Sequence, residues 1–264
     1  MKYVAKELKE TVDNSSGNRS LRFLLKNALY VAAVLLIGYI LVIFTAIYLA
    51  GVIPDKWEAE TFGKADELLT GKFDGQEATI FKNIDDTGFK RTKKIFEKVL
   101  EEGATRELDY RLYYSSEPMA NAFAVPGGHV IVTKGLLEMV ESEEGLAFVL
   151  AHELGHHEKR HCLKRLSRTV SVGLVTTFLG GFDNASLVDS SVNISDLHYS
   201  RVQENEADEY AVEIIKKLYG NDEKCLEFFE KVAEDYTLPQ WASFTQTHPH
   251  VEERLEHLKS LLEE

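Results

Sequence analysis

An uncharged, apolar run from Ala28 to Pro54 sets the first limit on how this chain can fold. Leu, Ile, Val and Ala dominate the run, and about 20 apolar residues are enough to cross the hydrocarbon core of a bilayer. A soluble helix of this length without a polar face would be unusual. Tyr30 and Tyr48 lie near its two ends, where aromatic rings favour the membrane interface. The run predicts one transmembrane helix, which Pro54 ends because it lacks the next helical donor.

Charge is distributed unevenly on the two sides of this run. Residues 1–27 carry six Lys and Arg against three Asp and Glu, whereas the whole chain has a formal net charge of −13. Because positively charged flanks stay in the cytoplasm, we expect 1–27 to be a basic cytoplasmic tail. Residues 28–54 would then be a single-pass anchor in the lipid bilayer, with the domain at 55–264 outside the cytoplasm. The run exceeds the roughly 7–15 residues of a signal-peptide core, and no small-x-small cleavage site follows, so we interpret it as uncleaved.

Composition excludes some classes of function. Acidic residues outnumber basic ones by 43 to 30, which argues against nucleic acid as a partner because phosphate binding needs a basic surface. Cys162 and Cys225 are the only cysteines, too few for a disulfide framework or a thiolate metal site. Two unlinked, buried thiols are the preferred interpretation, although an oxidising compartment would allow them to pair.

Periodicity after residue 55 predicts a mostly helical α+β domain. Residues 55–104 are typical of two or three amphipathic helices, ending at Gly103. The expected strands are 108–114, 122–125 and 129–133. The expected helices are 136–140, 143–161 with Ser142 as its cap, 195–218, and two more before the C-terminus. The apolar stretch within 170–182 is too short to span a membrane, so it is either a core helix or a helix at the membrane surface.

The run HELGH at 152–156 places two histidines four residues apart. On a helix, His152 and His156 lie on one face, so both imidazoles can bind a single metal ion. Glu153 is one step around the helix, where its carboxylate can act on a water beside the ion instead of binding the ion. Two neutral nitrogen ligands, an open coordination position and a nearby base are what metal-assisted amide hydrolysis needs. The apolar residues Leu146, Ala147, Val149, Leu150 and Ala151 lie directly before the run, so we expect its histidines to be buried for a function.

A second acidic pair downstream offers a third ligand. Glu204 and Asp208 are also four residues apart on a predicted helix, so their carboxylates share a face. Zinc in hydrolytic sites usually has three protein ligands and a water, often two His and one Glu. We therefore expect Glu204 to complete the metal shell. Asp208 would accept the second ring N–H of a ligand histidine and so orient its imidazole.

Four segments together resemble the M48 family of gluzincin metallopeptidases. They are NAFAVPGG at 121–128, HELGH at 152–156, SRVQENEAD at 200–208 and THP at 247–249. The resemblance covers about residues 115–258 and implies an α+β, mostly helical gluzincin-type domain with a small β-sheet, here preceded by one transmembrane helix. It also implies that one zinc ion per chain is bound by His152, His156 and Glu204, that Glu153 is the catalytic base, and that Asp208 supports the shell.

The resemblance implies further roles that the residues alone do not. Asn121, Phe123, Gly127 and Gly128 would line the substrate cleft, where an exposed strand edge can pair with an extended peptide; the alternative for the two glycines is a plain turn. His248 is similar to a family histidine near the metal that stabilises the oxyanion or blocks the open coordination position; the alternative is a loop residue before a helix. The other groups considered are expected at the surface, at helix ends or in structural positions: His129, His157, His161, His198, Arg201, Glu206 and His250.

The resulting hypothesis is a membrane-anchored zinc metalloendopeptidase that hydrolyses peptide bonds through a water activated by Glu153 at zinc. By family resemblance, its polypeptide substrates would be unfolded or damaged envelope proteins. One alternative is a latent or non-catalytic, zinc-stabilised, chaperone-like module at the membrane; Glu153 beside both histidines argues against it. Another is a membrane adaptor in which the run at 152–156 is accidental, which the downstream segments oppose. The sequence leaves the oligomeric state open.

Overall fold

The computed structural model describes residues 17–63, 69–70, 80–180, 198–234 and 242–263. The chain divides into two units, Met1–Phe44 and Thr45–Glu264. The first helix, α1 (Gly17–Val52), begins upstream of the predicted anchor and ends two residues before Pro54. Its part from Leu21 to Val52 is long and apolar enough to cross a membrane, judged by length and composition. Large apolar side chains along it are exposed, as a segment in contact with lipid requires.

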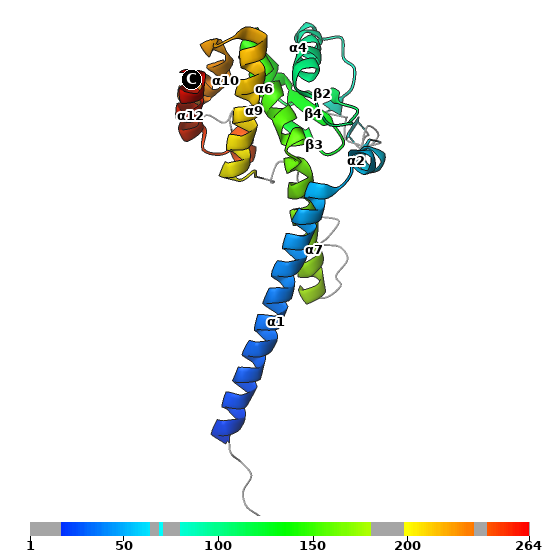
Figure 1. Cartoon of the computed structure of the whole chain (residues 1–264), viewed down its shortest axis with the longest axis vertical. Coiled ribbons are helices and arrows are strands. Elements are labelled where there is room, and N and C mark those ends of the chain that lie inside the picture. The colour runs from blue at the N-terminus through cyan, green and yellow to red at the C-terminus, as the bar shows by residue number, and fades with distance from the viewer. Residues whose placement is uncertain (1–16, 64–68, 71–79, 181–197, 235–241, 264) are drawn as a thin grey trace, which may run out of the picture. The chain divides into compact units, whose positions relative to one another are not determined.

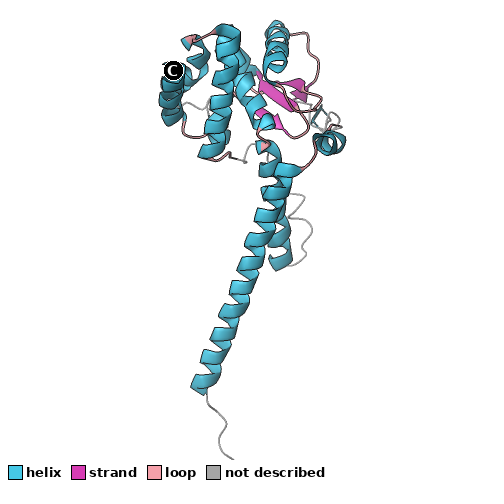
Figure 2. Ribbon diagram, viewed as in Figure 1, coloured by secondary structure: helices cyan, strands magenta, loops and turns pink. Residues whose placement is uncertain are grey.

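The second unit combines helices with a four-stranded mixed sheet (Figure 2). Its strands are β1 (Ile80–Phe81), β2 (Arg111–Ser115), β3 (Ala122–Val125) and β4 (His129–Thr133). They lie in the order β1-β2-β4-β3, so β3 is an edge strand. Strands β2 and β4 are parallel, and both outer pairs are antiparallel.

Helices make up most of this unit. They are α2 (Asp55–Phe62), α4 (Thr87–Gly103), α5 (Lys134–Met139), α6 (Glu143–Glu158), α7 (His161–Gly180), α9 (Arg201–Tyr219), the 3₁₀ turn η2 (Glu223–Leu226), α10 (Glu227–Glu234), α11 (Ala242–Thr247) and α12 (Val251–Glu263). The order of helices and strands confirms a mostly helical α+β fold with a small sheet.

The central helix is α6, which lies between α9 and the sheet (Figure 1). It is buried on every side from Gly145 to His157, so its sequence is apolar all round except at the HELGH run. Ser142 caps its first turn by accepting a hydrogen bond from the backbone N–H of Gly145 at 3.0 Å, as predicted. The partner α9 begins with a capping box formed by Ser200 and Gln203.

Close approach of α6 and α9 depends on Gly155, inside the HELGH run. A Cβ atom there would lie 3.1 Å from the Cα of Ala207 and 3.1 Å from the ring of Tyr210. A larger residue at either small position would push the helices apart. The two small residues therefore set the distance between the helix that carries the histidines and the helix that carries Glu204.

Three predicted boundaries differ from the structure. The expected helix at 143–161 is broken, because Arg160 has a left-handed backbone (φ 58°) between α6 and α7. The first main strand starts at Arg111 instead of 108, and α9 starts at Arg201. Part of the expected 195–218 helix (195–197) and the end of the 170–182 stretch lie outside the described residues. Cys162 and Cys225 are buried free thiols, which confirms the preferred interpretation.

Candidate metal centre

The three predicted ligands converge in the core of the second unit. The Nε2 atoms of His152 and His156, on one face of α6, lie 3.1 Å apart. The carboxylate of Glu204, on α9, is 3.5 Å from Nε2 of His152 and 3.6 Å from Nε2 of His156. All three side chains are almost completely buried. The close packing at Gly155 thus brings two nitrogen donors and one carboxylate to a common point.

His248 joins this cluster from the loop between α11 and α12. Its Nδ1 lies 3.2 Å from the Glu204 carboxylate and 3.4 Å from Nε2 of His152. Its Nε2 faces Glu153 at 3.5 Å, and its ring stacks on Phe244 at 5.0 Å between centroids. His248 is therefore placed as a fourth potential ligand, with its other nitrogen toward the predicted base.

The spacing of these donor atoms fits a zinc ion. Ligand atoms about 2.0–2.2 Å from a tetrahedral ion stand about 3.3–3.6 Å from one another. Five separations among the two Nε2 atoms, the Glu204 oxygens and Nδ1 of His248 run from 3.1 to 3.6 Å, and donor atoms from all four side chains lie within 4.8 Å of one another. Imidazole and carboxylate are also the donor types that zinc takes in hydrolytic sites. Donor chemistry and spacing agree on one small cation.

A buried ion pair between Asp208 and Arg254 contacts the predicted ligands His152 and Glu204. Nδ1 of His152 lies 2.9 Å from the Asp208 carboxylate, the contact expected from the sequence. Arg254, on α12, donates two hydrogen bonds of 2.7 Å to Asp208 and places a third guanidinium nitrogen 2.5 Å from Glu204. Arg254 is 1% exposed and was not predicted from the sequence. The clue was its position three residues after Val251 and four before Leu258, on the apolar face of its helix.

The charge of the cluster also calls for a cation. Glu153, Glu204 and Asp208 are buried carboxylates, and Arg254 is the buried guanidinium beside them. Three carboxyl groups thus share this core with one guanidinium, an excess of acidic groups that a divalent ion would offset. Within the described residues, neither oxygen of Glu153 has a hydrogen-bond partner. An unpaired buried carboxylate is costly, so it marks a place where water or substrate is expected to bind.

The pKa shifts follow from burial and from these neighbours. Burial would raise the pKa of Glu204 and of Asp208, but the Arg254 guanidinium lowers the pKa of both carboxyls. Burial and the neighbouring His152 hold the pKa of His156 well below its usual value. Burial opposes protonation of His152, yet hydrogen bonds to Asp208 and Glu204 raise its pKa to about 9. The carboxylates of Glu204 and Asp208 are thus held ionised. Their negative charge favours a cation beside them, or a proton on His152.

The four predicted substrate-binding residues fall in two places. Asn121 is buried, its backbone N–H bonds Thr133 at 2.8 Å, and its side chain is 3.5 Å from Thr247, next to His248. Phe123 is half-buried on the edge strand β3. Gly127 and Gly128 have positive φ in the β3–β4 turn, and their nearest neighbours are Phe62 and residues 108–109. The contacts of the two glycines explain a turn that packs against α2, and their predicted role with substrate stays a prediction.

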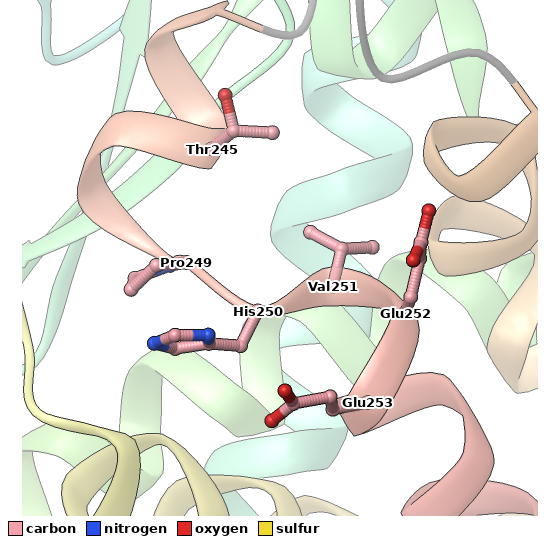
Figure 3. Close-up of a pocket in the computed structure, with 6 residues that line it drawn as sticks. All are labelled: Thr245, Pro249, His250, Val251, Glu252 and Glu253. Atoms are coloured by element: carbon pink, nitrogen blue, oxygen red, sulfur yellow. The ribbon is translucent and has the colours of Figure 1, made fainter.

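One pocket flanks the loop that follows His248. It has a volume of about 280 Å³ and is lined by Thr245, Pro249, His250, Val251, Glu252 and Glu253 (Figure 3). The lining includes none of the clustered side chains. The cluster itself is enclosed, because Glu153, His156, Glu204 and His248 are each 0% exposed.

Three histidines expected at the surface or at helix ends are buried. Nε2 of His129 donates to the carbonyl of Phe62 at 2.9 Å, and Nδ1 accepts from the hydroxyl of Tyr113 at 3.1 Å. His157 contacts the backbone carbonyl of His129 at 3.1 Å. His161 contacts His156. The surface prediction was wrong for His129, which is buried on β4, whereas His157 and His161 do lie at helix ends, the last turn of α6 and the start of α7, but with buried side chains.

The remaining groups lie nearer to the expectation. His198 and His250 are exposed, and Arg201 forms a 3.0 Å ion pair with Glu253 between half-exposed side chains. Glu206 is about half exposed, but it also reaches His161 at 2.9 Å. Its predicted role as a purely solvated group is therefore incomplete.

Residues 87–262 match the model of peptidase family M48. The chain belongs to this family. The matched range contains all the clustered side chains, and it confirms the resemblance inferred from the four segments.

Relatives of this M48 chain are named as a metalloendopeptidase and a metalloprotease. It is 27% identical over 180 residues to mitochondrial metalloendopeptidase OMA1 of Schizosaccharomyces pombe, covering 65% of this chain and 52% of that protein. It is 27% identical over 159 residues to metalloprotease YcaL of Escherichia coli, covering 58% of this chain and 61% of that protein. The matches thus span about half to three fifths of these relatives. A crystal structure of S. mikatae Ste24p aligns with 91% of this chain and 65% of that chain, at a TM-score of 0.40 and 17% identity.

Proposed function

We propose that this chain is a membrane-anchored zinc metalloendopeptidase. The observation that carries the proposal is the convergence of His152, His156 and Glu204 beside Glu153, a buried carboxylate without a hydrogen-bond partner among the described residues. Membership of a peptidase family supports the same activity. An accidental HELGH run would explain neither the third ligand nor the negative charge gathered in the core.

The residues divide the chemistry between them. When bound, zinc acts as a Lewis acid that polarises the scissile carbonyl and makes water a better nucleophile. His152, His156 and Glu204 would hold the ion. Glu153 would take the proton from the attacking water and deliver it to the leaving amine, so that one carboxylate acts first as base and then as acid. Asp208 would keep the His152 ring in the orientation that presents Nε2 to the ion.

Substrate would bind along the outer edge of the sheet. Strand β3 is an edge strand whose neighbour on the other side is β4, so an extended peptide can add to it by backbone pairing. Phe123 and Asn121 lie on or beside this strand. Backbone pairing tolerates many side chains, which suits a peptidase that acts on unfolded or damaged proteins of the envelope. The anchor α1, with its positive flank, would keep the N-terminal tail in the cytoplasm and the second unit outside it.

A latent state is the second candidate, because His248 occupies a fourth ligand position and Glu153 is 0% exposed. In this state the chain would hold zinc without turnover. The variant His248→Ala separates the two: increased cleavage would show that His248 blocks the site, and decreased cleavage with unchanged zinc would show that it assists the reaction.

The decisive experiment compares the detergent-solubilised chain with its Glu153→Gln variant in zinc content and casein cleavage. We expect one zinc ion in both proteins and cleavage only by the unmodified chain. Glu144→Gln, on the same helix but outside the cluster, is the control and should cleave normally. Equal cleavage by Glu153→Gln would refute the assigned base, and a lack of zinc in the unmodified chain would refute the metal site.

A further inference from the structure

A chain of polar contacts leads from the predicted ligand His156 to the surface. Nδ1 of His156 lies 3.0 Å from Nδ1 of His161, and Nε2 of His161 lies 2.9 Å from the carboxylate of Glu206. The His161 side chain is 0% exposed, whereas that of Glu206 is 45% exposed. The contacts therefore run from the buried cluster through a second imidazole to a carboxylate at the rim.

Hydrogen-bond chemistry allows one arrangement of protons when His156 binds a metal. Its Nε2 faces the other ligands, so its proton is on Nδ1 and is donated. Nδ1 of His161 must then accept, which places the His161 proton on Nε2, opposite Glu206. Each contact has one donor and one acceptor, so the three side chains form a consistent series.

The backbone has an unusual feature where this contact forms. On a continuous helix, a residue five positions after His156 would lie about 140° around the axis and could not face it. Arg160 takes a left-handed conformation with φ 58°, which ends α6 and starts α7 at His161. Such a backbone is unfavourable for a residue other than glycine. It is held by the Arg160 guanidinium, which contacts Asp55 at 2.6 Å.

We propose that His161 and Glu206 are positioning residues for the metal ligand His156, acting as a histidine–carboxylate pair equivalent to Asp208 at His152. The proposal rests on the zinc site of the proposed function. His152 has a direct carboxylate partner at 2.9 Å, whereas His156 reaches its carboxylate through one imidazole. Both ligand rings are thereby fixed in the tautomer that leaves Nε2 free to bind. Outer partners of this kind commonly change metal affinity by about 10–100-fold.

The test measures the affinity of the full chain in detergent for Zn²⁺ alone, by competition with a chromophoric chelator. His161→Phe keeps a ring of similar size but removes the acceptor, and we expect about 10–100-fold weaker binding. The matched control is His157→Phe. His157 is equally buried and neighbours the ligand in sequence, but its ring contacts the backbone of His129, so its loss should leave Zn²⁺ affinity within about twofold, whatever it does to thermal unfolding.

A second pair of variants changes Glu206, whose half-exposed side chain can be replaced without disrupting the buried core. Glu206→Gln keeps an oxygen that accepts from His161, and Glu206→Leu removes it. We expect the Leu variant to bind Zn²⁺ several-fold more weakly and the Gln variant to restore most of the affinity. Equal affinity for both Glu206 variants, or an equal loss in His157→Phe and His161→Phe, would overturn the proposal. Failure of the unmodified chain to bind Zn²⁺ would refute the metal site itself, and with it this proposal.

Discussion

The carboxylate of Glu227 links the start of α10 to the start of α6, the helix that carries the HELGH run. It accepts hydrogen bonds from the backbone N–H of Glu141 at 3.0 Å and of Ser142 at 2.8 Å, and from the hydroxyl of Ser142. Lys231 donates to it at 2.7 Å. Burial alone would raise the pKa of Glu227, but these donors lower it to about 2. Ser142 caps α6, so the same network holds the N-terminus of the helix that carries His152.

The size and sign of the effect follow from this pKa. The folded-state pKa of about 2 lies below the ordinary value of 4.5, so the ionised carboxylate stabilises the folded state at pH values above about 4.5. The side chain is only 18% exposed, and the difference corresponds to about 3 kcal/mol of unfolding free energy. The stabilisation is lost as the pH falls from 4.5 towards 2, and about 2 kcal/mol of it is gone by pH 3.

The variant Glu227→Gln tests this reasoning through urea unfolding of the detergent-solubilised chain, followed by circular dichroism from pH 7 to pH 3. We expect the variant to be less stable by about 2–3 kcal/mol at pH 7 and to approach the unmodified chain as the pH falls. Glu230→Gln is the matched control, since Glu230 is on the same helix and about half exposed in its pair with Lys259. A stability difference that stays constant with pH would refute the assigned role of the Glu227 charge.

Three further outcomes concern the metal centre. Arg254→Met leaves two buried carboxylates without their cation and should destabilise the zinc-free protein by about 3–5 kcal/mol in thermal unfolding. The Arg254→Met/Asp208→Asn double variant should recover part of this loss, and an unchanged unfolding transition in Arg254→Met would contradict the buried ion pair. Glu204→Gln should lower zinc affinity, and unchanged zinc content would move the third ligand elsewhere. Chelation should lower the unfolding temperature, because free zinc at about 1,000 times its Kd stabilises the folded state by about 4 kcal/mol; no shift would mean that zinc does not bind the folded chain.

Local patterns in the sequence were sufficient for the type of most elements and for the residues that cluster at the candidate metal centre. They missed the short strand β1, which lies within 55–104, where helices were predicted, and one of the three α-helices that follow α9. Spacing of four residues on a helix placed His152 beside His156, and Glu204 beside Asp208, because both depend only on helix geometry. The uncharged run predicted the long helix α1, and the cap at Ser142 was correct for the same local reason. Boundaries were less accurate, since the break at Arg160 is a non-local feature that its contact with Asp55 helps to hold.

Tertiary structure alone decided which side chains meet. Arg254 and His161 carry no motif, and they reach the cluster only because α12 and α7 pack where they do. His157 is buried because the elements around α6 cover this helix on all sides, and such coverage has no signature in the sequence of α6 itself. His129, on β4, is buried in contact with Tyr113 and the carbonyl of Phe62. The predicted ligand types therefore follow from short-range periodicity. The charge balance and orientation of those ligands depend on contacts between segments about 50 to 100 residues apart, because only the folded core brings those segments together.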